Sequence, residues 1–105
     1  MPYRVQITET ALAELGAIQP FNRQRIKDYI DRLLPSNPTQ TSKSRVKKLV
    51  DLESPQYRLR VDDFRVFYDV DAENEIVTVL RILEKSMVEE YLKEIRDERE
   101  KRKSG

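Results

Sequence analysis

Three arginines lie close together in the middle of the chain, at spacings that suit the binding of an anion. Arg58 and Arg60 alternate with apolar residues in the segment 57–61, and Arg65 follows a short polar turn. If this segment is a strand, both guanidinium groups project from one face, roughly 6.5 to 7 Å apart. Arginine stays protonated and binds phosphate through paired hydrogen bonds, so the three side chains suit a polynucleotide backbone. The alternative is a solvated sheet face on which the arginines pair with nearby Asp or Glu.

Histidine and cysteine are both absent from the 105 residues. Without histidine, the usual acid–base group near neutral pH is missing. Without cysteine, thiolate catalysis, disulfides, zinc fingers and iron–sulfur clusters are excluded. A metal site would have to use carboxylates or hydroxyls, and we expect neither a metal nor another cofactor.

Charge is dense but nearly balanced, with 20 Lys and Arg against 19 Asp and Glu, a formal net charge of +1. The sequence pI is about 7.9, whereas a nucleic-acid-binding domain usually has a pI above ~9. Residues 43–68 hold seven bases and four acids, a net of +3, and residues 69–105 hold eight bases and eleven acids, a net of −3. Any site that binds a polyanion must therefore be confined to one part of the chain, such as the positive segment 43–68.

Periodicity predicts the elements that position these residues. Alternation of apolar and polar residues indicates strands, and apolar residues at i, i+3, i+4 and i+7 indicate helices. The expected elements are a strand at 3–7, a helix capped by Thr8 or Thr10 and ended by Pro20, a helix from about Asn22 to Leu34, a polar loop at 35–42, strands at 46–52, 57–61, 64–70 and 76–83, and a helix that follows a capping box at Ser86–Glu89.

This order predicts an α+β domain with an N-terminal strand, a helical hairpin, a four-stranded, mainly antiparallel meander and a C-terminal helix. The strand at 76–83 is apolar on both faces, so we expect it to be central and covered by helices. Residues 1–95 form one domain, and the charged residues 96–105 are expected to be a flexible tail. No apolar run approaches the ~20 residues of a membrane span, which favours a soluble, cytoplasmic protein with no membrane partner.

The segment 57–70, Tyr-Arg-Leu-Arg-Val-Asp-Asp-Phe-Arg-Val-Phe-Tyr-Asp-Val, resembles the strand–turn–strand core of the RelE/ParE superfamily of bacterial toxins from type II toxin–antitoxin systems. The segment 77–82 resembles the final strand of that family, and the order of elements is similar as well. The resemblance extends from Tyr3 to about Leu92 and implies a RelE/ParE-like fold.

Resemblance to the RelE branch implies a ribosome-dependent endoribonuclease, or mRNA interferase, that inhibits translation. Its implied catalytic residues are Arg58, Arg60, Arg65, Lys85 and Tyr91. Such chemistry suits a chain without histidine, because the RNA supplies its own 2′-OH nucleophile while arginines stabilise the phosphate charge. Lys85 or Tyr91 would serve as base or acid. Tyr91 has an equally plausible structural role, since it lies on the apolar stripe of the last helix.

Two alternatives remain open. A ParE-like toxin would bind and inhibit DNA gyrase without catalytic residues, and a diverged member would be a non-toxic interaction module. All three imply a cognate antitoxin protein as partner, with the ribosome and mRNA as further partners for a RelE-like toxin and gyrase for a ParE-like one. The antitoxin is expected to be acidic and partly helical.

Overall fold

The computed structural model describes residues 2–104, except for the side chains of residues 103 and 104. In chain order the elements are β1 (Arg4–Ile7), α1 (Glu9–Gly16), α2 (Pro20–Leu33), β2 (Val46–Lys48), β3 (Tyr57–Val61), β4 (Phe64–Asp71), β5 (Ile76–Glu84), a 3-10 turn (Lys85–Met87) and α3 (Val88–Ser104). The expected α+β class and the expected order of elements are both confirmed.

The five strands form one sheet in the order β1-β5-β4-β3-β2. Strands β2 to β5 form an antiparallel meander, and β1 pairs in parallel with the first half of β5. A parallel pair needs a long crossover, and here the helices α1 and α2 lie within it. The strand β5 lies inside the sheet between β1 and β4, in agreement with its continuous apolar sequence, although β4 is the middle strand.

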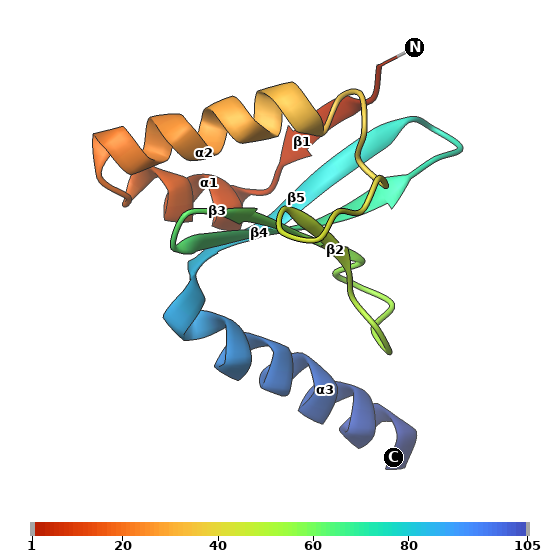
Figure 1. The fold of residues 1–105 in the computed structure, drawn as a ribbon. Coiled ribbons are helices and arrows are strands. Elements are labelled where there is room, and N and C mark those ends of the chain that lie inside the picture. Colours follow the sequence, from red (N-terminus) through yellow and green to blue (C-terminus); the bar gives the residue numbers. More distant parts are fainter. Residues whose placement is uncertain (1, 105) are drawn as a thin grey trace.

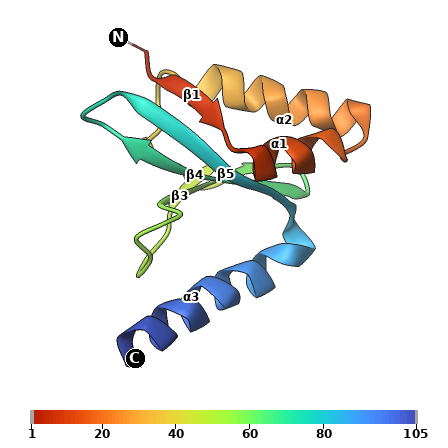
Figure 2. The same ribbon diagram turned by 180° about the vertical axis from the view of Figure 1, so that it is seen from behind.

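Helices cover both faces of the sheet, but unequally. Figures 1 and 2 show α1 and α2 packed together on one face and α3 alone on the other, with its C-terminal end directed away from the sheet. Apolar residues of α1 and α2, among them Leu15, Ile26 and Ile30, form the main core with the inward residues of β3, β4 and β5. Tyr68 lies inside this core, stacked on Tyr57 at 5.5 Å.

Several element boundaries differ from those expected. The helix α2 begins at Pro20, two residues early, because proline suits the first turn of a helix, where its missing N–H is not needed. The strand expected over 46–52 ends at Lys48, and Asp51 adopts a left-handed conformation with φ 64°, which does not continue a strand. Thr8 is the N-cap of α1, and its Oγ1 accepts a hydrogen bond from the Ala11 N–H at 3.1 Å. Ser86 lies within the 3-10 turn, so the expected capping box does not start α3.

Residues 96–104 continue α3 as helix, whereas the sequence had favoured a flexible tail. Acidic residues precede basic ones by four positions, as in Asp97/Lys101 and Glu98/Arg102, a spacing that supports a helix even without an apolar stripe. Arg99 also anchors the helix, because its Nη1 donates a hydrogen bond to the carbonyl oxygen of Asp51. Whether this segment is mobile in solution stays a prediction, and Gly105 lies outside the described residues.

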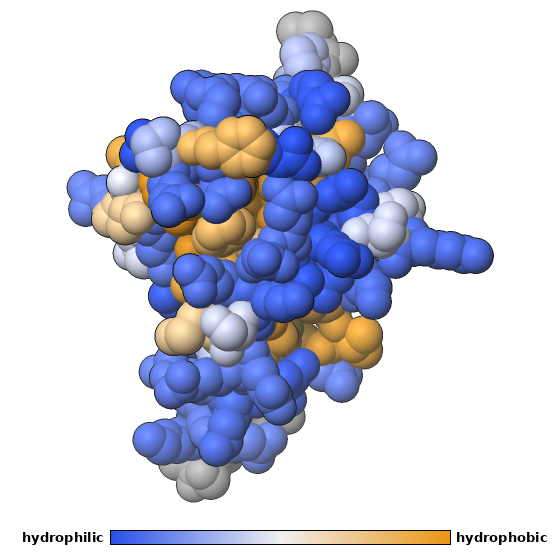
Figure 3. All heavy atoms as spheres, turned by 60° about the vertical axis from the view of Figure 1, so that its left-hand side comes forward, coloured by the Kyte–Doolittle hydropathy of each residue, from blue (hydrophilic) through white to orange (hydrophobic). Residues whose placement is uncertain are grey.

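The face of the molecule drawn in Figure 3 is largely hydrophilic. In this view, which brings the α1–α2 connection towards the viewer, apolar atoms gather in a hollow framed by hydrophilic ones. None of the helices found in residues 2–104 is both long and apolar enough to span a membrane.

Candidate functional site

The structure brings the three arginines together on the sheet face that carries α3. Arg58 and Arg60 alternate on β3 with buried residues that face the other side, and Arg60 is the direct cross-strand partner of Arg65 on β4. Arg60 is exposed, whereas Arg58 and Arg65 are half-buried. The tight turn between β3 and β4 therefore creates one cluster, which we call the arginine face (Arg58, Arg60 and Arg65).

The positive charge of the arginine face is only weakly compensated by carboxylates, since Asp63 acts on Arg65 without forming an ion pair. No ion pair involves any of its three side chains within the described part of the chain. Burial and then the charge of Arg60 lower the pKa of Arg58, and burial followed by Arg58 and Arg60 lowers the pKa of Arg65. The buried Nε of Arg58 has no hydrogen-bond partner. These features describe a site that would gain electrostatic stabilisation from a bound anion.

Arg65 is the most restrained of the three arginines. Its Nη1 donates hydrogen bonds to the carbonyl oxygens of Asp62 and Phe64, both at 2.9 Å. These bonds hold the guanidinium against the β3–β4 turn. Asp62, at φ 53°, occupies the left-handed position of this turn, which Asp and Asn tolerate better than most residues.

Lys85 lies at the same end of the sheet, directly after β5. Its backbone N–H donates to the carbonyl oxygen of Asp63 at 2.7 Å, and its Nζ lies 3.6 Å from the Asp63 carboxylate. Both side chains are well exposed, so the ion pair is weak and easily exchanged for another anion. The structure thus places Lys85 beside the turn that carries the arginine face.

Tyr91 packs on the sheet instead of standing free. Its ring contacts Phe67 with a centroid distance of 5.0 Å, and the Arg81 guanidinium lies 4.9 Å from its centroid. Burial raises the pKa of Tyr91, while the nearby Arg81 opposes this shift. Since Phe67 is the cross-strand partner of Arg58, Tyr91 lies over a strand position next to the arginine face. The structure therefore supports a packing role, and a catalytic role stays a prediction.

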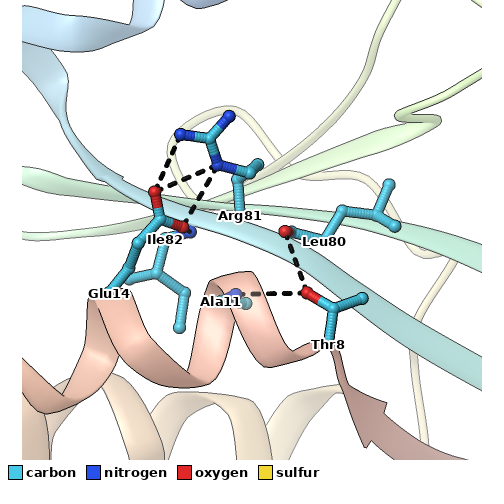
Figure 4. Close-up of polar contacts among 6 residues, drawn as sticks. All are labelled: Thr8, Ala11, Glu14, Leu80, Arg81 and Ile82. Carbon is cyan, nitrogen blue, oxygen red and sulfur yellow. Dashed lines mark hydrogen bonds and ion pairs between the residues drawn. The ribbon is translucent and has the colours of Figure 1, made fainter.

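Arg81 and Glu14 form a network that sequence reasoning did not single out (Figure 4). The Glu14 carboxylate accepts hydrogen bonds from Arg81 Nε and Nη2, the latter at 2.8 Å, and from the Ile82 backbone N–H at 2.9 Å. Thr8 Oγ1 donates to the Leu80 carbonyl oxygen at 3.2 Å. The available signal was a single arginine within an otherwise apolar strand, because such a charge needs a partner.

The described residues offer no ready metal site. No group of three or more acidic side chains within residues 2–104 is placed to hold a metal ion. The arginine face itself carries fixed positive charge, which can bind and stabilise an anionic group.

Comparison with solved structures finds the same fold in several toxin–antitoxin proteins. The toxin–antitoxin complex RelBE2 from Mycobacterium tuberculosis matches with 24% identity and a TM-score of 0.69, over 80% of this chain and 99% of that one. The archaeal RelE–RelB complex from Pyrococcus horikoshii matches with 27% identity and a TM-score of 0.67, over 80% and 96%. The isolated E. coli RelE toxin matches with 20% identity and a TM-score of 0.62, over 89% and 98%. Among curated proteins no sequence matches.

A family model supports the same assignment at the sequence level. The model of the ParE toxin of the type II toxin–antitoxin system parDE matches residues 5–89, which is most of the chain. The match includes β1 to β5 and the start of α3, and with them the arginine face and Lys85. The chain therefore belongs to the ParE toxin family of type II toxin–antitoxin systems, on a fold that it shares with RelE toxins.

Proposed function

We propose that this chain is a toxin that cleaves messenger RNA on the ribosome. The observation that carries the proposal is the arginine face, where three guanidinium groups share one side of the sheet without a carboxylate ion pair in the described residues. A bound phosphodiester would relieve the repulsion among them and supply hydrogen-bond acceptors. The fold that the chain shares with RelE toxins leads to the same proposal, because resemblance to the RelE branch implies a ribosome-dependent endoribonuclease.

The reaction would use a nucleophile from the substrate. The RNA 2′-oxygen attacks the adjacent phosphorus, the bond from phosphorus to the 5′-oxygen breaks, and a 2′,3′-cyclic phosphate remains. The 2′-OH loses a proton and the 5′-oxygen gains one, so the step balances without a metal or redox partner. Arg58, Arg60 and Arg65 would stabilise the extra negative charge on the phosphorane.

Lys85 and Tyr91 would complete the site in different ways. Lys85 is exposed beside the β3–β4 turn and can leave its weak contact with Asp63 to reach a phosphate. The Tyr91 phenol is protonated at neutral pH, as a proton donor must be, and the burial that raises its pKa makes it a weaker acid than an exposed tyrosine. Tyr91 already packs on Phe67, which lies on the same strand as Arg65. The phenol could therefore act beside the arginine face without a large movement of α3.

Mapping of RNA 5′ ends after induction in growing cells tests this proposal. The wild type should produce new 5′ ends within translated messages, and Arg60→Gln should reduce cleavage by about 10²-fold, a typical effect of losing one donor to an oxyanion. Arg4→Gln is the matched control, since Arg4 is an exposed strand arginine on β1, away from the arginine face. Growth arrest without new 5′ ends would refute the nuclease proposal.

Inhibition of DNA gyrase is the second candidate function. The match to the ParE family model favours it, and so does the state of the implied acid and base, since Lys85 pairs with Asp63 and Tyr91 packs on Phe67. Gyrase inhibition predicts that Lys85→Ala and Tyr91→Phe keep full toxicity and that purified protein blocks DNA supercoiling. Absence of any growth defect on expression would instead indicate a diverged, non-toxic member.

We also propose a cognate antitoxin as the partner of this chain. The solved complexes from Mycobacterium tuberculosis and Pyrococcus horikoshii each pair a related toxin with RelB. An acidic, partly helical segment would neutralise the arginine face. Co-purification with the product of a neighbouring gene tests this pairing, and Arg58→Glu combined with Arg60→Glu should weaken it. Retention of the partner by the double variant would exclude the arginine face as the contact.

A further inference from the structure

A cavity of about 650 Å³ opens where the α1–α2 connection meets the start of β4 and the end of β5. Its apolar lining comes from Ile18, Phe64, Ile82 and Leu83, and Ala17 lies at its exposed rim. It lies in the region of the surface where apolar atoms gather in a hollow (Figure 3). The cavity is large enough for one or two apolar side chains of another polypeptide.

The end of β5 beside this cavity has an edge that is open only beyond the Ile82 N–H, because the Leu80 carbonyl oxygen already accepts a hydrogen bond from Thr8 Oγ1. The strand β1 pairs only with Ile76–Val79, so residues 80–84 have no strand on that side. The Ile82 N–H points to this edge, where Glu14 accepts its hydrogen bond, whereas the Lys85 N–H points to the β4 side. Because N–H directions alternate along a strand, the Glu84 N–H points to the open edge. An extended peptide could pair there as an added strand.

Acidic side chains surround this edge on both sides of the sheet. Glu14, Asp63 and Glu84 line the cavity, and Glu90 and Glu94 line a smaller cavity of about 190 Å³ on the α3 side. None of the residues that line the larger cavity is basic, and Leu83 lines both. Two cations form ion pairs with these acids: Arg81 with Glu14 and Lys85 with Asp63. Arg65 also acts on Asp63 from the neighbouring arginine face. The five acids still outnumber these three cations, and no ion pair among the described residues involves Glu84, Glu90 or Glu94.

We propose that the open edge of β5 docks an extended, basic segment of a partner polypeptide in which apolar and basic residues alternate. The segment would add a strand beside Glu84, insert its apolar side chains into the cavity under α1, and direct its Lys or Arg side chains towards Glu90 and Glu94. Side chains of a strand alternate between the two faces, so one segment can satisfy both cavities. This surface adjoins the arginine face at the β3–β4 turn, where Asp63 and Phe64 line the cavity and also interact with Arg65. The carboxylates around the β5 edge favour a basic partner, whereas the arginine face favours an acidic one.

A synthetic peptide can probe the surface directly. The probe is a fluorescein-labelled peptide of seven residues that alternates leucine and arginine, titrated with the full chain and followed by fluorescence anisotropy. The control peptide carries glutamate in place of arginine. The basic peptide should bind at least about tenfold more tightly than the acidic one, because like charges at an interface disfavour binding. Equal binding of the two peptides, or no binding of the basic one up to millimolar concentrations, would overturn the proposal.

Matched variants locate the binding surface. Ala17→Arg places a cation at the rim of the cavity, and Ala13→Arg makes the same change at another exposed position of α1 outside its lining. Glu84→Lys reverses a charge at the edge, and Glu73→Lys does so in the exposed turn before β5. We expect a loss in peptide affinity of about tenfold for Ala17→Arg and Glu84→Lys, and less than about twofold for the controls. Equal losses in a test variant and its control would refute the assignment.

Two further measurements distinguish strand addition from general charge attraction and from self-association. Hydrogen exchange at the Glu84 amide should slow when the peptide is bound, because that N–H gains a partner. An unchanged exchange rate with peptide bound would rule out an added strand. In sedimentation experiments on the chain alone, we expect no self-association through this surface. Self-association through it would be recognised because Ala17→Arg abolishes it. Such an association would identify a second copy of this chain as the occupant and overturn the basic-peptide proposal.

Discussion

Replacement of Glu14 by alanine should lower the free energy of unfolding by about 2 to 3 kcal/mol. Glu14 accepts the Ile82 backbone N–H at 2.9 Å and two nitrogens of Arg81, and its side chain is 21% exposed. An unpaired donor at a part-buried position costs about 1 to 3 kcal/mol. The ion pair adds at most about 1 kcal/mol, because Arg81 is 34% exposed and solvent screens the charges.

Urea unfolding followed by far-UV circular dichroism at neutral pH measures this loss. A loss of that size corresponds to a fall in Tm of about 8 to 12 °C for a domain near 100 residues. Glu14→Gln keeps an acceptor for the Ile82 N–H and should lose about half as much as Glu14→Ala. A double-mutant cycle with Arg81→Met should give a coupling energy of about 1 kcal/mol, since the two side chains are in direct contact.

The matched control is Glu73→Ala, which removes an exposed carboxylate from the turn between β4 and β5. Its effect should stay within about 0.5 kcal/mol, as for most surface substitutions. If Glu14→Ala unfolds at the same urea concentration as Glu73→Ala, then the Glu14 network does not stabilise the end of β5. Zero coupling to Arg81 would assign the whole effect to the Ile82 N–H.

Four further outcomes are expected from contacts in the structure. Tyr91→Phe should keep the ring contacts and change stability by less than about 1 kcal/mol, whereas Tyr91→Ala should cost about 2 kcal/mol in urea unfolding. Burial raises the pKa of Tyr91 in the folded chain above the ordinary 10.0, so the phenol of the unfolded chain loses its proton first as the pH rises. The wild type should therefore lose stability relative to Tyr91→Phe only above about pH 10. A pH-dependent loss already present at neutral pH would contradict this reasoning. Two hydrogen bonds from Arg25 lower the pKa of Asp62 below 3.8, so Asp62→Asn should lower Tm at neutral pH. The difference in Tm between the wild type and Asp62→Asn should disappear as the pH falls through the lowered pKa. A difference that is as large in strong acid as at neutral pH would refute this linkage. Arg60→Gln should leave stability unchanged or raise it by up to about 0.5 kcal/mol, because it removes repulsion from Arg58 and no ion pair, and a marked loss in urea unfolding would show that the arginine face is needed for the fold.

The periodic parts of the fold were predictable from the sequence. Alternation on β3 and β4 predicted both strands and placed Arg58 and Arg60 on one face, because the side-chain period of a strand is fixed at two residues. The ends of strands were harder to predict from the sequence where they coincide with an unusual backbone conformation. The strand β2 ends at Lys48, and Asp51 then adopts a left-handed conformation that its sequence context does not reveal.

For the candidate site, the sequence by itself determined the residue types and their spacing, and the tertiary structure decided their surroundings. Sequence proximity was enough to join Arg58, Arg60 and Arg65 across a two-residue turn, but not to show that they lack carboxylate partners in the described residues. Glu14 contacts Arg81 and Ile82 at the end of β5, and these residues are separated from it by 67 and 68 positions in the sequence. Such contacts follow from the packing of α1 against the sheet, and no local pattern of residues encodes that packing.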